Sequence, residues 1–415
     1  MRKSNAFDWL TIILYFILVI FGWMNIYSAS FSGAETSYFD MDQPYGKQAV
    51  FIVLSVVLIV FLLALESKFY ERFASIIYIG SLLSLIGLFV FGKTISGATS
   101  WYAFGSFSLQ PSEFAKAATA LALAKYLSDI QTDIKTLKNQ LGSFLIIFLP
   151  AILIIPQPDP GSALVYLAFL FPLYREGLSG FYLIIGASLI LIFILTLVLG
   201  SIWVSMIIVL LGILFYFYRR RRASIPKIGI LLLFGILFSF SVNYIFNNLF
   251  EQRHRDRFNI VLGKEVDAKG IGYNTNQSQI AIGSGGLKGK GWTQGTQTKG
   301  NFVPEQHTDY IFSTVGEEWG FLGTSFFIII YTLLLIRLLV MAERQKSQFN
   351  RVYGYSVLGI LFIHFVVNVG MVIGLMPTVG IPLPFFSYGG SGLWGFTILL
   401  FIFVKLDGNR KSLQF

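Results

Sequence analysis

Residues 180–218 read GFYLIIGASLILIFILTLVLGSIWVSMIIVLLGILFYFY and contain no charged side chain. A membrane-spanning helix needs about 20 consecutive apolar residues, and this stretch holds two such segments, 180–199 and 202–218. Because a lipid-exposed backbone must satisfy its own hydrogen bonds, we expect each segment to be a helix. The stretch therefore predicts an all-α, polytopic integral membrane protein.

The composition also indicates a membrane protein and excludes several kinds of active site. Of 415 residues, 55% are hydrophobic and only 13% are charged, whereas soluble domains usually carry about 25% charged residues. Cysteine is absent, which excludes a disulfide framework, a thiolate nucleophile, an iron–sulfur cluster and a cysteine zinc site. The 3 histidines are too few for a histidine-rich metal centre.

Apolar runs of similar length recur along the chain, so we expect about twelve membrane-spanning helices in a single membrane domain over residues 1–415. The expected spans are roughly 9–28, 48–65, 73–91, 111–127, 140–156, 161–174, 180–199, 202–218, 227–247, 309–340, 354–375 and 388–405. The run 161–174 is short for a full crossing, which suits a tilted or partly re-entrant helix.

The positions of the basic residues predict the orientation of these spans. Arg2 and Lys3 precede the first span, which places the N-terminus in the cytoplasm. An even number of crossings returns the C-terminus to the same side. The four arginines at 219–222 then also face the cytoplasm, whereas the acidic loop 29–47 faces outward.

Residues 249–308 form the only long loop, and this orientation places it on the extracytoplasmic side. The chain has a formal net charge of +10, and the loop contributes bases that the orientation rule does not require. These bases are Arg253, Arg255, Arg257, Lys264, Lys269, Lys288, Lys290 and Lys299. An anionic ligand explains them, and a solvated basic loop is the alternative. Nucleic acid is not expected, because the basic residues of the chain are divided between the two membrane faces.

The segment 270–300 of this loop is rich in glycine. Its centre, residues 277–291, reads QSQIAIGSGGLKGKG. Glycines such as those at 283–286 let backbone N–H groups converge on an anion, and Lys288 and Lys290 add positive charge. A phosphate-bearing substrate fits this pattern, and a flexible loop is the alternative.

The loop ends in PEQHTDYIF, residues 304–312, where the next span begins. We expect Asp309 in the first helical turn, with Thr308 as the N-cap. The helix dipole would keep the carboxylate ionised, so that Asp309 could act as a general base. Stabilisation of the helix start is the alternative. Glu317 and Glu318 follow about 12 Å further along the same helix; acids inside a span are usually functional, and an interfacial position is the alternative.

Charged residues also mark the outer ends of other expected spans. Glu113 and Lys116 are three residues apart at the start of the span 111–127 and can pair on one helix face. Such a pair would clamp helices together, serve a functional role, or do both. Asp159 is a third acid of the outer face, in the connection before the span that begins at residue 161.

Two further segments near the C-terminus contain polar or irregular sequence. The segment 380–392 is rich in proline and glycine, and irregular backbone of this kind is tolerated in a membrane only where it lines a cavity or is covered by protein. His364 lies one turn from Asn368 in the preceding span. We expect this histidine to be a buried packing residue.

Six blocks of sequence, in one order between about residues 97 and 392, resemble the SEDS family of shape, elongation, division and sporulation proteins. They are Trp101 with QPSE and Lys116 at 110–116, PDxG at 158–161, QRxR at 252–255, QS through GSGG at 277–286, PExHTD through EE at 304–318, and PFxSYGGS at 384–391. Several unlinked blocks in one order make a specific signal. Within the family, the chain looks more like the RodA branch than the division-type FtsW branch.

The resemblance implies a SEDS-type helical bundle and a peptidoglycan glycosyltransferase that polymerises lipid II on the outer face of the bacterial cytoplasmic membrane. It also implies a class B penicillin-binding protein and other elongation-complex membrane proteins as partners. Asp309 matches the family's catalytic acid. Glu113 and Lys116 match a functionally important pair of the family, Asp159 matches a sensitive acid, and Arg253 and Arg255 match basic positions of its long loop. The other residues that we expect to bind substrate are Gln277, Ser278, Gly285, Lys288, Lys290, His307 and Ser387.

The implied reaction sets three chemical tasks. A base must accept a hydroxyl proton, cations or N–H donors must stabilise a departing pyrophosphate, and an apolar surface must hold polyprenyl tails. No cofactor is required. A divalent cation such as Mg²⁺ or Mn²⁺ that bridges the pyrophosphate to an acid is compatible with the reaction.

The chain departs from the family pattern, and other functions remain open. Family members usually have ten spans, so the segments 180–199 and 202–218 form an extra pair. The loop 97–100 lacks an arginine often found there, and Pro160 replaces a common leucine. The alternatives are a lipid II flippase, a scaffold that recruits cell-wall proteins, or a division-type paralogue. The chain has no obvious inverted repeat, which argues against a transporter.

Overall fold

The computed structural model describes residues 7–31, 39–95, 97–105, 107–219, 225–248, 250, 252–264 and 272–409. Its contacts separate two compact units, one of Met1–Leu178 with Tyr273–Phe415 and one of Ser179–Gly272. The single domain over residues 1–415 stays a prediction. Several charges used to predict the orientation lie outside the described residues, namely Arg2, Lys3, Glu35, Arg220, Arg221, Arg222, Arg410 and Lys411, as does Lys269 of the long loop.

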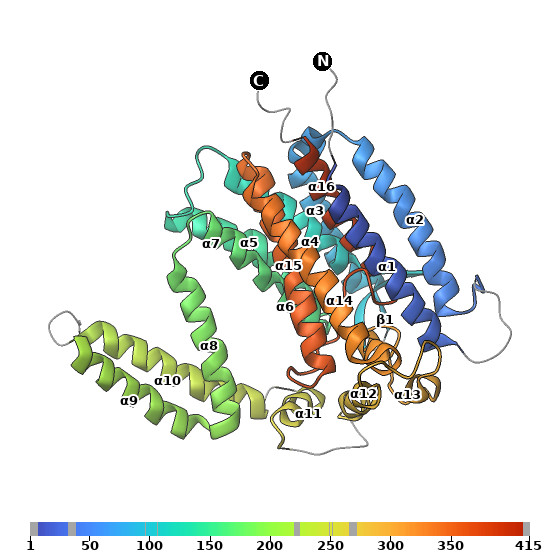
Figure 1. The fold of residues 1–415 in the computed structure, drawn as a ribbon. Helices are drawn as coiled ribbons and strands as arrows, with labels where there is room; N and C mark the ends of the chain where they lie inside the picture. The colour runs from blue at the N-terminus through green and yellow to red at the C-terminus, as the bar shows by residue number, and fades with distance from the viewer. Residues whose placement is uncertain are drawn as a thin grey trace. The chain divides into compact units, whose positions relative to one another are not determined.

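The first unit is a helical bundle with a short β-sheet in one connection (Figure 1). Its N-terminal helices are α1 (Trp9–Ser30), α2 (Pro44–Ala64), α3 (Ser67–Phe91), α4 (Pro111–Ser128), α5 (Leu137–Ile154), α6 (Pro160–Val165), the 3₁₀ helix η1 (Tyr166–Phe169) and α7 (Leu170–Arg175). Its C-terminal helices are α12 (Tyr273–Ser284), α13 (Thr296–Lys299), α14 (Ile311–Glu343), α15 (Gln348–Val372) and α16 (Gly390–Gly408).

The predicted all-α membrane fold is confirmed, and ten helices in the described part of the chain are long and apolar enough to cross a membrane. The other two predicted spans differ from these. The segment 111–127 is the helix α4, which is mostly buried and carries Glu113, Lys116 and Lys125. The segment 161–174 is divided among α6, η1 and α7, with Pro172 inside the run. Ten, rather than about twelve, is therefore the number that length and apolarity support.

The helix α4 is the centre of the first unit. It packs against α3, α5, α15 and α16. Its buried face is largely alanine, and small side chains let neighbouring helices approach closely. A helix surrounded by protein needs no lipid-facing apolar surface, which explains why α4 can carry charged residues.

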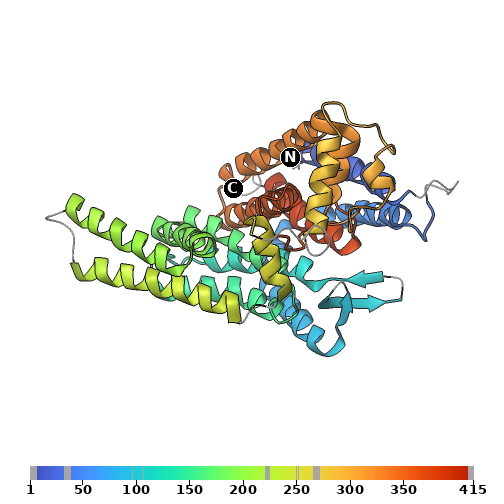
Figure 2. The ribbon, with the colours of Figure 1, turned by 90° about the horizontal axis from the view of Figure 1, so that it is seen from below.

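A three-stranded antiparallel sheet, which the sequence analysis did not predict, lies in the connection between α3 and α4. It consists of β1 (Lys93–Ile95), β2 (Ala98–Phe104) and β3 (Phe107–Leu109), in that order. The hydroxyl of Tyr102 donates to the backbone oxygen of Ser84 at 2.8 Å, which ties the sheet to α3. Figure 2 shows the strands projecting beside α3.

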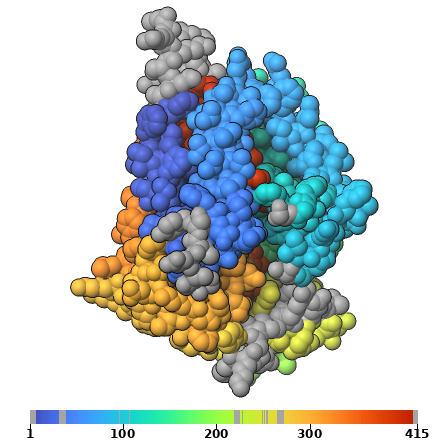
Figure 3. Space-filling model, turned by 90° about the vertical axis from the view of Figure 1, so that its right-hand side faces the viewer, coloured from blue at the N-terminus to red at the C-terminus, as the bar shows by residue number. Residues whose placement is uncertain are grey.

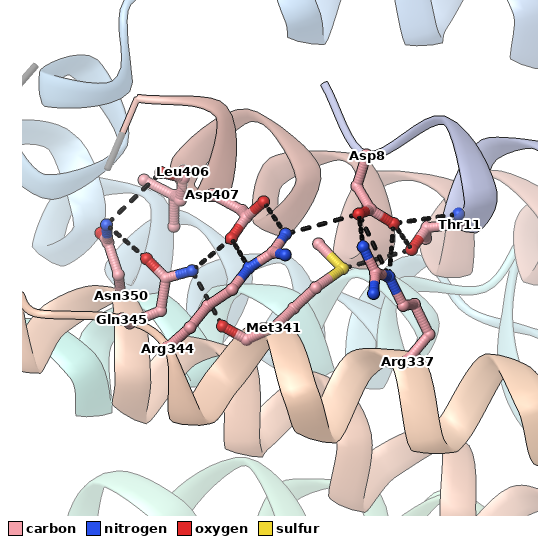
Figure 4. Close-up of polar contacts among 9 residues, drawn as sticks. All are labelled: Asp8, Thr11, Arg337, Met341, Arg344, Gln345, Asn350, Leu406 and Asp407. Atoms are coloured by element: carbon pink, nitrogen blue, oxygen red, sulfur yellow. Dashed lines mark hydrogen bonds and ion pairs between the residues drawn. The ribbon is translucent and has the colours of Figure 1, made fainter. Parts of the chain in front are cut away.

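The described termini of the first unit lie at one end of the bundle, opposite α12 and α13 (Figure 1). A polar cluster joins three elements at this end (Figure 4). Asp8 caps α1 by accepting from the Thr11 N–H at 3.1 Å and also accepts from Arg337 of α14. Arg344 donates to Asp407 of α16 at 2.8 Å. Two carboxylates and two guanidinium groups therefore hold the start of α1 and the ends of α14 and α16 together.

At the opposite end, residues 284–310 cover the ends of the helices. In Figure 3 this orange segment closes the bundle below α1 and α2. The helix α12 packs against α14 and α15, and α13 packs against α1. The predicted long loop 249–308 therefore contains ordered helices, of which α12 and α13 belong to the first unit.

The second unit contains α8 (Gly180–Leu199), α9 (Ser201–Arg219), α10 (Ile225–Asn248) and α11 (Gln252–Val261). The predicted spans 180–199 and 202–218 correspond to α8 and α9. Both are among the ten candidate spans, so the count does not make them an extra pair. An apolar cluster of Leu197, Val242 and Phe246 holds this unit together, with Phe258 of α11 packed against it. Buried hydroxyls of Thr196 and Ser239 share a hydrogen bond of 2.8 Å between α8 and α10.

Candidate active site

Asp309 lies in a turn just before α14, and the predicted local geometry is wrong in two respects. The helix begins at Ile311, with Tyr310 at the N-cap position. Thr308 does not cap the helix, because Tyr310 occupies the N-cap position. The Thr308 hydroxyl donates to the carboxylate of Glu305 at 3.0 Å. Glu305 has a positive φ of 56°, and its backbone oxygen accepts from the N–H groups of Thr308 and Tyr310. This turn replaces the expected first turn of the helix.

The proline- and glycine-rich segment before α16 holds this turn from a second side. Ser387 donates its hydroxyl to the backbone oxygen of Thr308 at 2.7 Å. The Tyr388 N–H donates to the backbone oxygen of His307 at 2.9 Å, and the two rings lie 5.4 Å apart. Ser387 is buried and is engaged in positioning the turn, so we revise its predicted role from binding substrate to holding Thr308.

The side chain of Asp309 is partly exposed and lies beside Gly380. A Cβ atom added to Gly380 would lie 3.6 Å from Asp309 Oδ2. Gly380 has a φ of +72°, a conformation that disfavours other residues. The backbone at residue 380 therefore favours glycine, and it lies beside the Asp309 carboxylate.

His307 is the histidine of the same turn, and its surroundings favour the neutral ring. Burial lowers the pKa of His307 below its ordinary value of 6.5, and the nearby charge of Glu305 opposes that shift only in part. A neutral imidazole next to Asp309 can donate or accept a hydrogen bond. His307 lies in the same turn as Asp309, and its predicted role in substrate binding stays a prediction.

The helix α15 holds the turn from a third side. Asn368 donates from Nδ2 to the backbone oxygens of Asp309, at 2.9 Å, and of Ile381, at 2.7 Å. The Tyr310 hydroxyl lies 2.9 Å from Thr378 Oγ1 and 3.2 Å from Thr275 Oγ1. The sequence did not predict the roles of Asn368, Tyr310, Thr378 and Thr275. Only folding brings α12, α14, α15 and the segment 378–382 together.

Glu113 and Lys116 form the predicted ion pair, with Lys116 Nζ 2.8 Å from Glu113 Oε1. The pair is almost completely buried, at 3% and 1% exposure. Lys116 also lies 3.0 Å from His364 Nε2 and 4.7 Å from the centre of the Phe396 ring. The pair therefore joins α4 to α15 and α16.

Asp159 caps α6 and connects it to the start of α4. One carboxylate oxygen accepts from the Ser162 N–H at 3.0 Å, and the other accepts from Gln110 at 2.9 Å. The next turn packs closely on the segment near Asp309, because a Cβ on Gly161 would clash with the backbone oxygen of Val379. Asp159 therefore supports the wall of the site through the backbone.

The glycine-rich segment of the long loop packs onto α14. The helix α14 breaks at Gly320, with φ 62° and ψ −157°. Four backbone hydrogen bonds join the segment to the break, from Lys290 to Glu317, from Gly291 to Glu318, from Phe321 to Gly286 and from Leu322 to Leu287. Gly285 lies so close to Gly316 that a side chain would clash with its backbone oxygen. We therefore revise the predicted role of Gly285 from anion binding to close packing.

Glu317 and Glu318 hold this segment in place. Lys290 Nζ lies 2.8 Å from Glu317 Oε1, and Glu317 also accepts from the N–H groups of Gln297 and Thr298 at 2.9 and 2.8 Å. Glu318 accepts from the hydroxyl of Ser28 on α1. Both acids are buried within the protein. Lys290 is engaged in a structural ion pair, which replaces its predicted role at the pyrophosphate.

The remaining predicted residues of the long loop differ in their surroundings. Ser278 is buried and donates to the backbone oxygen of Val372 at 2.8 Å, so its role is structural. Gln277 is partly buried and Lys288 is exposed. Arg255 belongs to the second unit, where it donates to Gln252 at 2.6 Å and to the backbone oxygen of Asn247 at 3.0 Å. Arg253 lies on α11, and its side chain falls outside the described residues.

Among the residues that the structure describes, no group of three or more His, Asp or Glu side chains is arranged to hold a metal ion. Three acids near this end of the first unit are engaged by protein donors instead. Asp159, Glu317 and Glu318 each accept hydrogen bonds from backbone N–H groups or side chains.

Comparison with known proteins identifies the family. The model of the FtsW, RodA and SpoVE cell cycle proteins matches residues 8–222 and 199–412. The peptidoglycan glycosyltransferase MrdB of Escherichia coli strain K12 is 34% identical over 400 residues, which cover 96% of this chain and 92% of MrdB. The peptidoglycan glycosyltransferase RodA of Treponema pallidum strain Nichols is 33% identical over 438 residues, which cover 99% of each chain.

A solved structure has the same fold. A chain from a peptidoglycan synthase complex that coordinates polymerization and crosslinking aligns with a TM-score of 0.70 and 26% identity, over 98% of both chains. The family model and both relatives span nearly the whole sequence. This multi-pass membrane protein therefore belongs to the FtsW, RodA and SpoVE family of cell cycle proteins.

Proposed function

We propose that this protein is a peptidoglycan glycosyltransferase that polymerises lipid II into glycan strands for cell elongation and shape. Relatives that carry this activity in their names match over nearly the full chain. The observation that carries the proposal is the placement of Asp309. Three separate parts of the chain fix its turn, and its carboxylate lies at the surface of the bundle end beside Gly380.

The proposed reaction joins two disaccharide units. Asp309 accepts the proton of the C4 hydroxyl of one sugar while that oxygen attacks the anomeric carbon of the other. The bond from the anomeric carbon to the lipid pyrophosphate breaks, and the lipid pyrophosphate leaves with the bonding electrons. One glycosidic bond forms, one glycosyl–phosphate bond breaks, and no covalent enzyme intermediate is needed. Asp309 must therefore be ionised and within hydrogen-bond reach of the hydroxyl.

The departing pyrophosphate carries negative charge and needs cations or N–H donors. We assign this task to Lys288, whose side chain is exposed. Arg253 and Arg255, which match basic positions of the family's long loop, stay candidates for the same task. His307, in the turn of Asp309, and Gln277, on α12, remain in the proposal as substrate-binding groups. The exposed apolar faces of the bundle suit the polyprenyl tails of two lipid substrates.

The proposed orientation follows the positive-inside rule. The N- and C-termini lie in the cytoplasm, and the end that carries Asp309 faces outward across the bacterial cytoplasmic membrane. We propose that a class B penicillin-binding protein cross-links the strands, and that other elongation-complex membrane proteins bind alongside it. The match to a chain of a peptidoglycan synthase complex supports such an assembly. The reaction requires no resident cofactor, and a Mg²⁺ or Mn²⁺ ion would act with the substrate pyrophosphate.

The test is polymerisation of labelled lipid II by the purified full-length protein, with and without a class B penicillin-binding protein. The Asp309→Asn variant should give no long glycan product while its thermal unfolding stays unchanged. Glu305→Gln is the matched control, because it removes an exposed carboxylate from the same turn and should leave polymerisation intact. Parallel reactions in EDTA, followed by Mg²⁺ or Mn²⁺, report whether a divalent cation contributes.

Two results would contradict the proposal. Full polymerisation by Asp309→Asn would remove Asp309 as the base. If no condition yields product while proteoliposomes scramble lipid II between leaflets, the protein is a transporter rather than a polymerase.

A further inference from the structure

His364 lies at the centre of a buried chain of polar contacts between the Glu113–Lys116 pair and the segment beside Asp309. Its Nε2 lies 3.0 Å from Lys116 Nζ, and its Nδ1 lies 3.1 Å from the backbone oxygen of Pro382. The imidazole is only 1% exposed. Both ring nitrogens therefore have protein partners on different elements.

The partners determine which ring nitrogen carries the proton. A lysine ammonium only donates hydrogen bonds, so His364 Nε2 accepts from Lys116. A backbone carbonyl only accepts, so the ring proton resides on Nδ1 and points to Pro382. The histidine is therefore a neutral, oriented link that joins α4, α15 and the segment 380–382.

The far end of this link meets the turn that carries the candidate base. Ile381, next to Pro382, accepts from Asn368 Nδ2 at 2.7 Å. The same amide donates to the backbone oxygen of Asp309 at 2.9 Å. Gly380, one residue further, lies against the Asp309 carboxylate. A shift of Pro382 would thus move both the backbone anchor of Asp309 and the surface beside its carboxylate.

We propose that His364 is a positioning residue for Asp309. It transmits the fixed geometry of the Glu113–Lys116 pair to the segment 380–382, which sets the place of the Asp309 carboxylate. This inference rests on the proposed function, since the effect is on glycan polymerisation. A polar side chain is costly to bury, and a residue needed for packing alone would not need two directed hydrogen bonds. Misplacement of a catalytic group by about 1 Å can lower a rate by about 10²-fold.

Two substitutions separate a positioning role from a packing role. The order of their kcat values is reversed between the two roles. His364→Phe keeps a ring of similar size but removes both hydrogen bonds. His364→Asn leaves a void but keeps an N–H donor near the position of Nδ1, within reach of Pro382. Under the positioning role, His364→Phe lowers kcat by about 10–100-fold with KM for lipid II unchanged. His364→Asn restores most of that loss.

Ser356→Ala is the matched control, because it removes another buried polar group two turns away on the same helix. It should leave kcat unchanged. Thermal unfolding of every variant, measured in the same detergent, identifies any variant that fails to fold. Wild-type protein and Asp309→Asn run in the same assay.

The outcomes are distinguishable. If wild-type protein does not polymerise lipid II, the proposed function fails before His364 is tested. If wild-type protein is active and His364→Phe retains its kcat, or if His364→Phe is more active than His364→Asn, His364 has only a packing role. A rise in KM at constant kcat would assign His364 to substrate binding and would also overturn the proposal.

Discussion

The Nδ2 atom of Asn368 lies 2.9 Å from the backbone oxygen of Asp309, so a buried amide of α15 anchors the turn that carries the candidate base. The same Nδ2 donates to Ile381 at 2.7 Å. One amide therefore holds two segments that are far apart in the sequence. The arrangement makes the position of Asp309 depend on an amide that is fully buried in the bundle.

The first prediction concerns this anchor. Asn368→Leu removes the hydrogen bonds to the backbone oxygens of Asp309 and Ile381. Each unsatisfied oxygen lowers the free energy of unfolding by about 1–3 kcal/mol. We expect kcat for lipid II polymerisation to fall at least tenfold. Asn350→Leu, which removes a buried amide at the other end of α15, should lower the melting temperature without a comparable loss of kcat. Equal kcat values for the two variants would contradict the anchoring role.

The second prediction uses the glycine beside the carboxylate. Gly380→Ala introduces a Cβ about 3.6 Å from Asp309 Oδ2 at a φ of +72°. Gly105→Ala has a similar φ of +61° but nothing within 4 Å of the new atom. Both changes carry a backbone cost of about 1–2 kcal/mol, but only Gly380→Ala should reduce polymerisation. Loss of activity in both would point to a general loss of stability, which the melting temperatures would reveal.

The third prediction separates two lysines that the sequence treats alike. Lys290→Met breaks the ion pair with the buried Glu317 and should lower the melting temperature while leaving KM for lipid II unchanged. Lys288→Met changes an exposed side chain and should raise KM without lowering the melting temperature. Steady-state kinetics and thermal unfolding of both variants are the measurements. The reverse pattern would return the pyrophosphate role to Lys290.

The fourth prediction concerns Asp8 and the stability of the protein at acidic pH. Burial alone would raise the pKa of Asp8, but hydrogen bonds from Arg337 and Thr11 outweigh it and hold the pKa below its ordinary value of 3.8. Its stabilising contribution is therefore full above pH 3.8 and is lost as the pH falls further toward the folded-state pKa. The melting temperature of wild-type protein should fall more steeply below about pH 4 than that of Asp8→Asn. Parallel slopes would show that Asp8 does not control acid unfolding.

The fifth prediction concerns His307. Because burial lowers its folded-state pKa below 6.5, the unfolded chain binds the proton more tightly. The contribution of His307 to stability is thus full above pH 6.5 and declines as the pH falls below that value. Thermal unfolding between pH 7.5 and 5 should show this decline in wild-type protein, and His307→Gln should reduce it. The two proteins should differ least in pH dependence above about pH 7.

The sequence was enough to predict the membrane fold and the family. Runs such as 180–199 and 202–218 have the length of a membrane-spanning helix, and a helix satisfies all of its backbone hydrogen bonds within the segment. The i, i+3 spacing of Glu113 and Lys116 predicted their ion pair, because that spacing places both side chains on one helix face. These features depend only on local composition and spacing, so they can be predicted from the sequence.

The sequence was misleading where a polar residue has a partner from a distant segment. Lys288 and Lys290 are two residues apart and look equivalent, yet only Lys290 pairs with Glu317, 27 residues away. Threonine is a residue type that often caps helices, but Glu305 has a positive φ and forms a turn in which its carboxylate accepts the hydrogen bond of the Thr308 hydroxyl. The short sheet at 93–109 forms because its strands pair with each other and Tyr102 bonds to α3.

The sequence by itself thus determined that the chain crosses a membrane as helices, which family it resembles, and that an acid at residue 309 follows a basic, glycine-rich loop. Only the tertiary structure decided which groups surround that acid. Gly380, Asn368 and Ser387 reach the turn of Asp309 from separate segments of the chain. The physical reason is that helix formation depends on hydrogen bonds and hydrophobicity within about 20 residues, whereas a site is defined by contacts that close long loops. Those contacts are set by packing and by the satisfaction of buried polar groups, and neither can be read from local spacing.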